Sequence, residues 1–90
     1  MFKNLEELIS VIRQRKKSPT EKSYTNKLLN NKKLSVEKVK EEIAELVDAI
    51  EKDTNKVHEA ADVLYHLMVL LEANGIKIED VMDELKNRQK

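Results

Sequence analysis

Residues 36–71, VEKVKEEIAELVDAIEKDTNKVHEAADVLYHLMVLL, decide the fold of this chain. Apolar residues recur every three or four positions on both sides of a short polar segment, which is the period of an α-helix. The first half carries one apolar stripe, from Val36 to Ile50. The second half is apolar around most of its circumference, a pattern typical of a buried helix. Because only a short turn separates the halves, we expect two antiparallel helices.

Residues that favour helix ends set the bounds of these two helices. Ser35 is a suitable N-cap for the first, which should end near Lys52. Thr54 can cap the second, which should run to Asn74, with Gly75 in the left-handed position beyond it. The same periodicity predicts three further helices, over residues 2–17, 24–31 and 78–88, the last with Val81, Met82 and Leu85 facing inward.

The composition favours helix throughout the chain. Its 90 residues include one Gly and one Pro, and 38% of them are charged. A domain of this size buries only about 60% of the surface that its unfolded chain exposes, and there is no cysteine for a disulfide. We therefore expect an all-α fold: one domain, residues 1–90, forming a small bundle of four to five helices that is completed by dimerisation.

The charge pattern excludes several classes of protein. Seventeen basic and seventeen acidic residues give a net charge of zero, which argues against binding nucleic acid through a bulk positive field. The basic residues gather between Arg13 and Lys33 and the acidic ones between Glu41 and Glu51, which suits a site pairing phosphate with cations. The first residues lack the apolar run of a secretory signal, and the longest uncharged run, 63–71, is too short to span a bilayer. The sequence predicts a cytoplasmic protein without nucleic-acid or membrane partners.

A narrow polar stripe on the second central helix is the strongest chemical signal. Glu59, Asp62 and His66 lie between apolar flanks at helical spacing. Burying carboxylates without a partner is costly, so such groups neutralise or find a cation. On the first central helix, Glu42 and Glu45 lie at one edge of the apolar stripe, three residues apart. If the two pairs face one another, four carboxylates converge.

Converging carboxylates favour a hard divalent cation. Oxygen ligands suit Mg²⁺, with Mn²⁺ as the alternative, and Mg²⁺ binds through a few carboxylates together with substrate phosphates. The competing interpretation is that Glu42 and Glu45 belong to a solvated face with local ion pairs. It explains Glu59 and Asp62 poorly, because their helix is otherwise apolar. His66 is expected to hydrogen-bond to Asp62 or to substrate.

Several segments resemble the phosphoribosyl-ATP pyrophosphohydrolase family, which is a member of the MazG-like superfamily. The resemblance runs from about residue 19 to the end, through Ser23-Tyr24-Thr25, residues 38–45, residues 59–67 and the stretch from Asp80 to Arg88. The Glu-x-x-Glu and Glu-x-x-Asp frame is common to the superfamily, whereas the Ser-Tyr-Thr segment and Ala-Asp-x-Leu-Tyr-His are more specific. Lys22 and Lys40 stand where the family pattern leads us to expect glycine.

The resemblance implies an Mg²⁺-dependent homodimeric enzyme of histidine biosynthesis. It would cleave the α–β phosphoanhydride of N1-(5-phosphoribosyl)-ATP, releasing the AMP derivative and pyrophosphate. By this likeness the catalytic and metal-binding residues are Glu42, Glu45, Glu59 and Asp62, with Glu41 as a further metal candidate. The implied substrate-binding residues are Ser23, Tyr24, Thr25, Lys27, Lys38, His66 and Arg88.

Two other functions fit the same residues. One is a MazG-like pyrophosphohydrolase acting on free nucleoside or deoxynucleoside triphosphates. The other is a non-enzymatic, dimeric helical interaction module with solvated carboxylates, against which the acidic stripe on an otherwise apolar helix argues.

Overall fold

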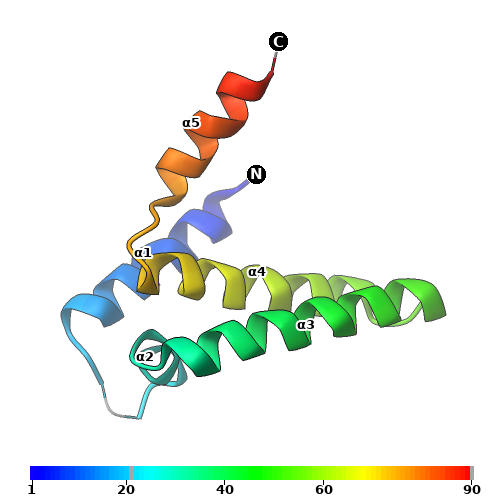
Figure 1. Cartoon of the computed structure of the whole chain (residues 1–90), viewed down its shortest axis with the longest axis horizontal. Coiled ribbons are helices and arrows are strands. Elements are labelled where there is room, and N and C mark those ends of the chain that lie inside the picture. Colours follow the sequence, from blue (N-terminus) through cyan, green and yellow to red (C-terminus); the bar gives the residue numbers. More distant parts are fainter. Residues whose placement is uncertain (21, 90) are drawn as a thin grey trace.

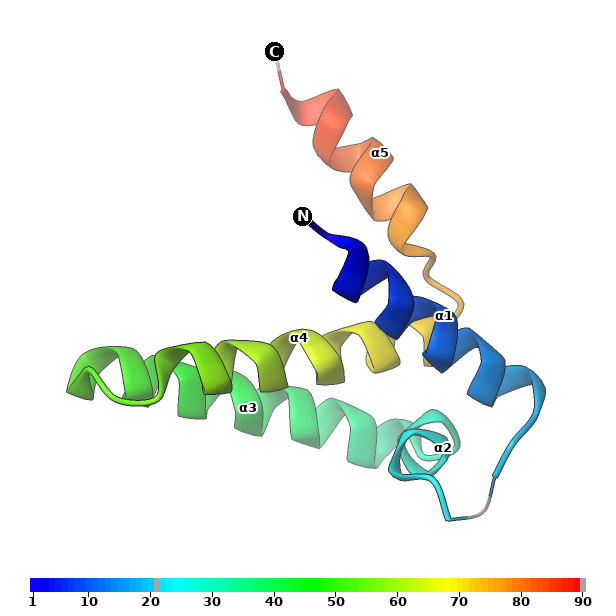
Figure 2. The same cartoon turned by 180° about the vertical axis from the view of Figure 1, so that it is seen from behind.

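The computed structural model describes residues 1–20 and 22–89, and within them every regular element is a helix. Helices α3 and α4 form an antiparallel hairpin, α1 and α2 cover one end of it, and α5 projects away from it (Figures 1 and 2). The predicted all-α bundle is therefore confirmed. The five helices are α1 (Lys3–Lys17), α2 (Tyr24–Leu29), α3 (Lys32–Lys52), α4 (Lys56–Ala73) and α5 (Ile78–Arg88).

The start of α3 differs from the expected one. The helix begins three residues before Ser35, because Asn31 acts as its N-cap and its side-chain oxygen accepts a hydrogen bond from the Leu34 N–H at 3.0 Å. Asn and Ser are nearly equal as caps, so the sequence alone does not separate them. Ser35 lies inside the helix and is buried. At the next helix Asn55, rather than Thr54, is the N-cap residue.

The hydrophobic core lies where α1 and α2 cross the C-terminal half of α4. Ile12, Leu28 and Val69 are fully buried there, one from each helix. Ile9 and Met68 complete the cluster, and partly buried leucines surround it. This core holds one end of the hairpin, while the other end extends beyond it.

The apolar stripe on α3 is only partly covered within the single chain: Val39 is buried, and the residues toward the turn are not. Ile43, Val47 and Ile50 are 46%, 49% and 57% exposed, and Leu64 and Val57 of α4 are 47% and 85% exposed. The expectation that α4 is buried is therefore wrong for its N-terminal half. Exposed apolar side chains that follow one another along two paired helices form a face suited to another protein surface.

Helix α5 also departs from the expectation. Met82 and Leu85 are 49% and 48% exposed and no residue of this helix is fully buried, so their predicted inward orientation is wrong. The helix is attached at its start, by Ile78 packing against the core and by charge. The guanidinium of Arg13 on α1 donates two hydrogen bonds to Glu79, at 2.6 and 2.9 Å, and a third, at 3.1 Å, to the buried Glu72 of α4.

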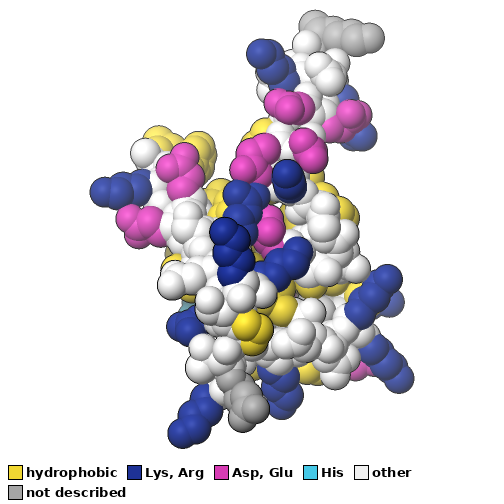
Figure 3. Space-filling view, turned by 90° about the vertical axis from the view of Figure 1, so that its left-hand side faces the viewer, with side chains coloured by type: hydrophobic (Ala, Val, Ile, Leu, Met, Phe, Trp, Pro, Cys, Tyr) yellow, Lys and Arg dark blue, Asp and Glu magenta, His cyan; other side chains and the backbone are white. Residues whose placement is uncertain are grey.

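This contact, which we call the Arg13 clamp, gives a structural role to basic residues at the start of the segment from Arg13 to Lys33. The Arg13 hydrogen bonds lower the pKa of Glu79 to about 2, and Lys16 Nζ donates to the carbonyl oxygen of Glu72 at 2.6 Å. Figure 3 shows the Lys and Arg side chains gathered on this face below the acidic side chains of the projecting helix. Arg13 and Lys16 of α1 therefore bond to α4, and Arg13 also to α5. This structural role accounts for their positive charge without a phosphate site.

The turn between α3 and α4 is built from two left-handed residues that are not glycine. Asp53 has φ 57° and Asn55 has φ 43°. Asp and Asn tolerate this region better than other residues with a Cβ, because their short side chains can bond locally. Asp53 also forms an ion pair with Lys56, whereas the side chain of Asn55 makes no cap hydrogen bond.

We expect Asn55→Ala to destabilise the protein and Asn55→Gly not to. Alanine in the left-handed region costs about 1 kcal/mol, and glycine adopts it without strain. Urea unfolding followed by circular dichroism measures both variants. Equal loss of stability in the two would show that the Asn55 side chain, rather than its backbone conformation, supports the turn.

Candidate metal centre

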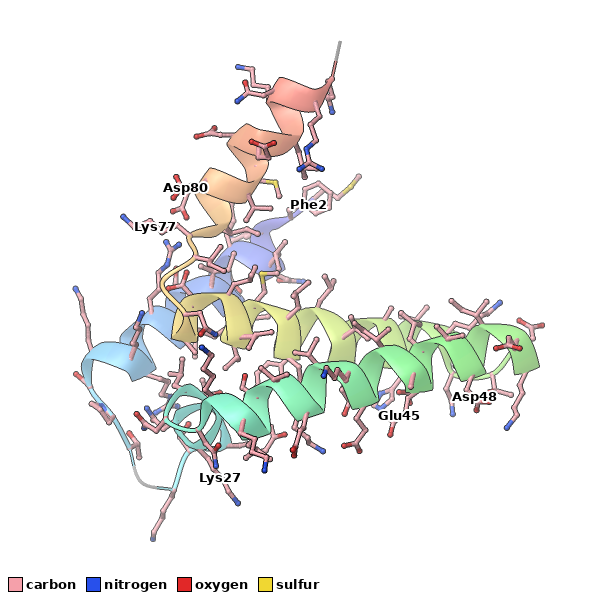
Figure 4. All side chains as sticks on the ribbon, viewed as in Figure 1. Phe2, Lys27, Glu45, Asp48, Lys77 and Asp80 are labelled. Atoms are coloured by element: carbon pink, nitrogen blue, oxygen red, sulfur yellow. The ribbon has the colours of Figure 1, made fainter. Side chains whose placement is uncertain are left out.

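The helix hairpin brings the predicted carboxylates to one place. Glu42 and Glu45 are one turn apart on α3, and Glu59 and Asp62 are one turn apart on the facing part of α4. Glu42 is buried at 7% exposure, and Glu59 and Asp62 are half-buried. Between the helices lies a hollow of about 420 Å³, lined by Glu41, Glu45, Asp48, Glu59 and the turn residues. Glu45 and Asp48 lie along α3 toward that turn (Figure 4).

The pKa values of Glu42 and Glu59 are both raised. Burial raises the pKa of Glu42, and the nearby Glu45 and Asp62 carboxylates raise it further. Burial likewise raises the pKa of Glu59, with the same two carboxylates adding to it. Like charges that disfavour one another's ionisation must be close. The four side chains singled out from the sequence, which we call the acidic cluster, thus form two groups, Glu42 and Glu45 on α3 and Glu59 and Asp62 on α4, and Glu45 and Glu59 line one hollow.

Two oxygen atoms of the acidic cluster are buried without a hydrogen-bond partner among the described residues. They are Oε2 of Glu42 and Oε2 of Glu59, one from each helix. A buried carboxylate oxygen without a donor is costly, and a divalent cation with oxygen ligands would satisfy both atoms and offset the mutual repulsion. The residues present therefore fit a hard cation between α3 and α4.

Glu41 and His58 lie next to the acidic cluster. Ligand atoms of Glu41, Glu42 and Glu45 lie within 4.8 Å of one another, and the same holds for His58, Glu59 and Asp62. His58 was not expected here. Its Nε2 lies 3.4 Å from Oδ2 of Asp62. The spacing of four residues, which places both side chains on one helix face, could have predicted this contact from the sequence.

His66 is held inside the protein by both ring nitrogens. Nδ1 lies 2.8 Å from the carbonyl oxygen of Asp62, and Nε2 lies 3.0 Å from the hydroxyl of Tyr24. The side chain is 7% exposed. The expected contact with Asp62 is present, and it is made to the main chain rather than to the carboxylate.

The Ser-Tyr-Thr segment forms the start of α2. The hydroxyl of Ser23 caps this helix by accepting from the Asn26 N–H at 3.3 Å, and the hydroxyl groups of Thr25 and Tyr65 are 2.6 Å apart. Beside it is a hollow of about 530 Å³, which we call the α2 hollow. Its lining includes Lys22, Ser23, Tyr24, Asn26, Lys27 and Asn30.

Comparison with known proteins places this arrangement in a family. Residues 5–89 match the sequence model of phosphoribosyl-ATP pyrophosphohydrolase. The chain belongs to this family. Its relatives include the phosphoribosyl-ATP pyrophosphatases of Methanoculleus marisnigri, 42% identical over 96% of this chain and 94% of the relative, and of Methanococcoides burtonii, 40% identical over 94% and 91%.

A third relative is a longer protein. The histidine biosynthesis bifunctional protein of Pyrococcus furiosus is 44% identical over 96% of this chain and 41% of its own length. The chain therefore spans about two-fifths of that bifunctional relative and nearly the whole of the other two. Among the described residues, no helix of this family member is long and apolar enough to cross a membrane.

Two cations suggested by the family resemblance lie in different settings. Lys38 is one helical turn before Glu41 and pairs with it at 3.4 Å, and the Glu41 carboxylate raises the pKa of Lys38. Burial raises the pKa of Tyr24 on α2, and the nearby charge of Lys38 opposes that rise. Arg88 pairs with Glu84 at 3.1 Å on the projecting α5, and the structure does not bring it to the cluster.

Proposed function

We propose that this protein hydrolyses N1-(5-phosphoribosyl)-ATP to phosphoribosyl-AMP and pyrophosphate, a reaction of histidine biosynthesis. Family membership supports the reaction class, and so do relatives described as phosphoribosyl-ATP pyrophosphatases. The observation that carries the proposal in this chain is the pair of buried oxygens in the acidic cluster, Oε2 of Glu42 and Oε2 of Glu59, that have no hydrogen-bond partner among the described residues. A solvated acidic face would leave those oxygens in water.

The cofactor we propose is Mg²⁺, with Mn²⁺ as a substitute. Glu42, Glu45, Glu59 and Asp62 would hold it, with Glu41 beside them, since the acidic cluster offers only hard oxygen ligands at its centre. When bound, such a cation supplies positive charge to phosphate oxygens and acidifies water.

The chain's own groups would then move the proton and orient the phosphates. Water adds to one phosphorus of the α–β anhydride, its proton passes to a cluster carboxylate, and the P–O bond between the α- and β-phosphates breaks to release pyrophosphate. A carboxylate of the acidic cluster lies where it could accept that proton, since a general base must be within hydrogen-bond reach of the proton it takes. Lys38 and Lys27 are the cations best placed to bind phosphate, one beside the cluster and one in the α2 hollow.

The exposed apolar face of the hairpin supports a homodimer as the working form. Ile43, Val47 and Ile50 of α3 and Leu64 of α4 are about half exposed, and a second copy would cover them. A dimer would also compensate for the modest core of a 90-residue chain. We infer that this dimer works in the cytoplasm on a small nucleotide, without nucleic-acid or membrane partners.

An assay of pyrophosphate release tests the proposal directly. With Mg²⁺, we expect release from phosphoribosyl-ATP at least about a hundredfold faster, as kcat/KM, than from dATP or dCTP, since each tenfold requires about 1.4 kcal/mol of discrimination. A chelator should abolish it. Equal rates on deoxynucleoside triphosphates would point to a general MazG-like hydrolase, and no release from any nucleotide would point to an interaction module.

A further inference from the structure

All three side chains of the Ser23-Tyr24-Thr25 segment are occupied by partners within the chain. Ser23 caps α2. Tyr24 and Thr25 bond to the adjacent α4 residues His66 and Tyr65, at 3.0 and 2.6 Å. Two parallel hydrogen bonds therefore fasten the start of α2 to α4. Side chains used in this way fix a helix in place, which differs from the direct substrate contact that the family resemblance suggested.

The proton positions at His66 follow from its partners. A carbonyl oxygen only accepts, so Nδ1 must carry the proton that it donates to the Asp62 carbonyl. In a neutral imidazole Nε2 is then an acceptor, and the Tyr24 hydroxyl donates to it. Both nitrogens are used, and neither is left to bind substrate.

Aromatic packing limits the orientation of the His66 ring. Its ring meets those of Tyr24 and Tyr65 edge-on, with centroids 5.8 and 5.0 Å away and interplanar angles of 78° and 88°. The two tyrosine rings are nearly parallel, 16° apart with centroids at 6.3 Å. Edge-to-face geometry is a favourable arrangement for aromatic rings, so packing and hydrogen bonds hold His66 in the same orientation.

His66 connects the two parts of the proposed site. Tyr24 lines the α2 hollow together with Lys22 and Lys27, and the other end of the His66 ring bonds to the main chain of Asp62 in the acidic cluster. Lys27 lies on α2 at the end of the hairpin, while Glu45 lies farther along α3 (Figure 4). The Tyr24–His66 hydrogen bond is therefore one of the contacts, with the Thr25–Tyr65 bond and the buried Leu28, that set the position of one part relative to the other.

We propose that His66 is a positioning residue that holds α2, and with it the α2 hollow, in register with the acidic cluster. The inference rests on the proposed function, because the register matters only if one substrate contacts both parts. Small displacements of a bound group can lower the rate by about a hundredfold. The Tyr24–His66 and Thr25–Tyr65 hydrogen bonds, both at the start of α2, would prevent such displacements.

Three variants isolate the hydrogen bond. His66→Phe keeps a ring between the tyrosines and removes both bonds, Tyr24→Phe removes the bond from the other side, and His66→Gln offers an amide oxygen near the place of Nε2. Asn74→Ala is the matched control, because Asn74 donates to the Leu70 carbonyl four residues earlier on α4, at 2.7 Å, at an exposed position.

For His66→Phe and Tyr24→Phe we expect kcat/KM for phosphoribosyl-ATP to fall about tenfold or more, with Mn²⁺ affinity by calorimetry unchanged. Amide hydrogen exchange should accelerate in α2 and stay the same in α3. The double variant should be no worse than the worse single one, since both remove the same bond. His66→Gln should recover most of the activity, and Asn74→Ala should match the wild type.

The outcomes separate this inference from the proposed function. An inactive wild-type protein would overturn the function. On an active wild-type background, wild-type kcat/KM in His66→Phe would overturn the positioning role alone. Weakened Mn²⁺ binding in that variant, with failure of His66→Gln to restore activity, would also overturn it, because His66 would then be acting on the cluster itself.

Discussion

We expect Glu59→Gln and Asp62→Asn each to lower the rate of pyrophosphate release by about a thousandfold or more, while the protein stays helical. Each change removes a charge from the acidic cluster and keeps the size and shape of the side chain. A thousandfold loss corresponds to about 4 kcal/mol of transition-state stabilisation, within the several kcal/mol that a bound metal supplies to phosphoryl oxygens. Initial rates with saturating Mg²⁺ measure the effect, and far-ultraviolet circular dichroism confirms the fold.

The matched control for these substitutions is Glu51→Gln. Glu51 is an exposed carboxylate on α3, outside the acidic cluster, and its neutralisation changes the net charge of the chain by the same amount. We expect it to retain wild-type activity. Full activity in Glu59→Gln or Asp62→Asn would contradict a metal centre at this position.

Glu42→Gln should stabilise the metal-free protein and remove the stabilising effect of Mg²⁺. Burial and neighbouring carboxylates disfavour the ionised form of Glu42, and a neutral amide avoids that cost. We expect the metal-free Tm to rise by about 5 °C, which roughly 1 kcal/mol produces in a domain of this size. In the wild-type protein, Mg²⁺ at a hundred times its Kd adds about 2.7 kcal/mol, a rise of about 10 °C or more.

The pH dependence follows from the sign of the same shift. Because the pKa of Glu42 is raised on folding, the folded state binds this proton more tightly than the unfolded state does. Stability of the metal-free protein therefore declines as pH rises from about 4.3, the unfolded value, through the folded pKa, and is level above it. Glu42→Gln should remove part of that decline.

Thermal melts of both proteins, with Mg²⁺ and with a chelator, measure the expected crossover. The variant should melt higher than the wild type in chelator and lower in Mg²⁺. The melts are compared at equal protein concentration and equal ionic strength, because association and screening also change Tm. An Mg²⁺-induced rise in Glu42→Gln equal to that of the wild type would remove Glu42 from the metal centre.

The sequence was sufficient to predict that the chain forms five helices and to single out the carboxylates of the acidic cluster, and the reason is local. Helical periodicity is a property of each segment by itself, and the spacing of Glu59 and Asp62 fixes their common face. A polar stripe on an apolar helix limits which way the carboxylates can point. Glu42 and Glu45 were singled out because they lie together at one edge of the apolar stripe of α3.

Contacts between distant segments could not be predicted in this way. Tyr24 and His66 are 42 residues apart, and Arg13 and Glu79 are 66 apart, so nothing in either local pattern indicates its partner. The inward orientation expected for Met82 failed for a related reason. An amphipathic pattern predicts which face is apolar, and it does not predict whether the same chain supplies the surface that covers it.

The core and the carboxylates occupy different stretches of α4. Val69, at its C-terminal half, is fully buried against α1 and α2, whereas Glu59 lies near the opposite end, beside the α3–α4 turn. The core contacts of α4 and its acidic-cluster carboxylates thus lie on separate parts of one helix. We expect changes in side-chain volume near Glu59 to alter ion preference with little loss of foldedness, which makes that region the natural place to redesign selectivity.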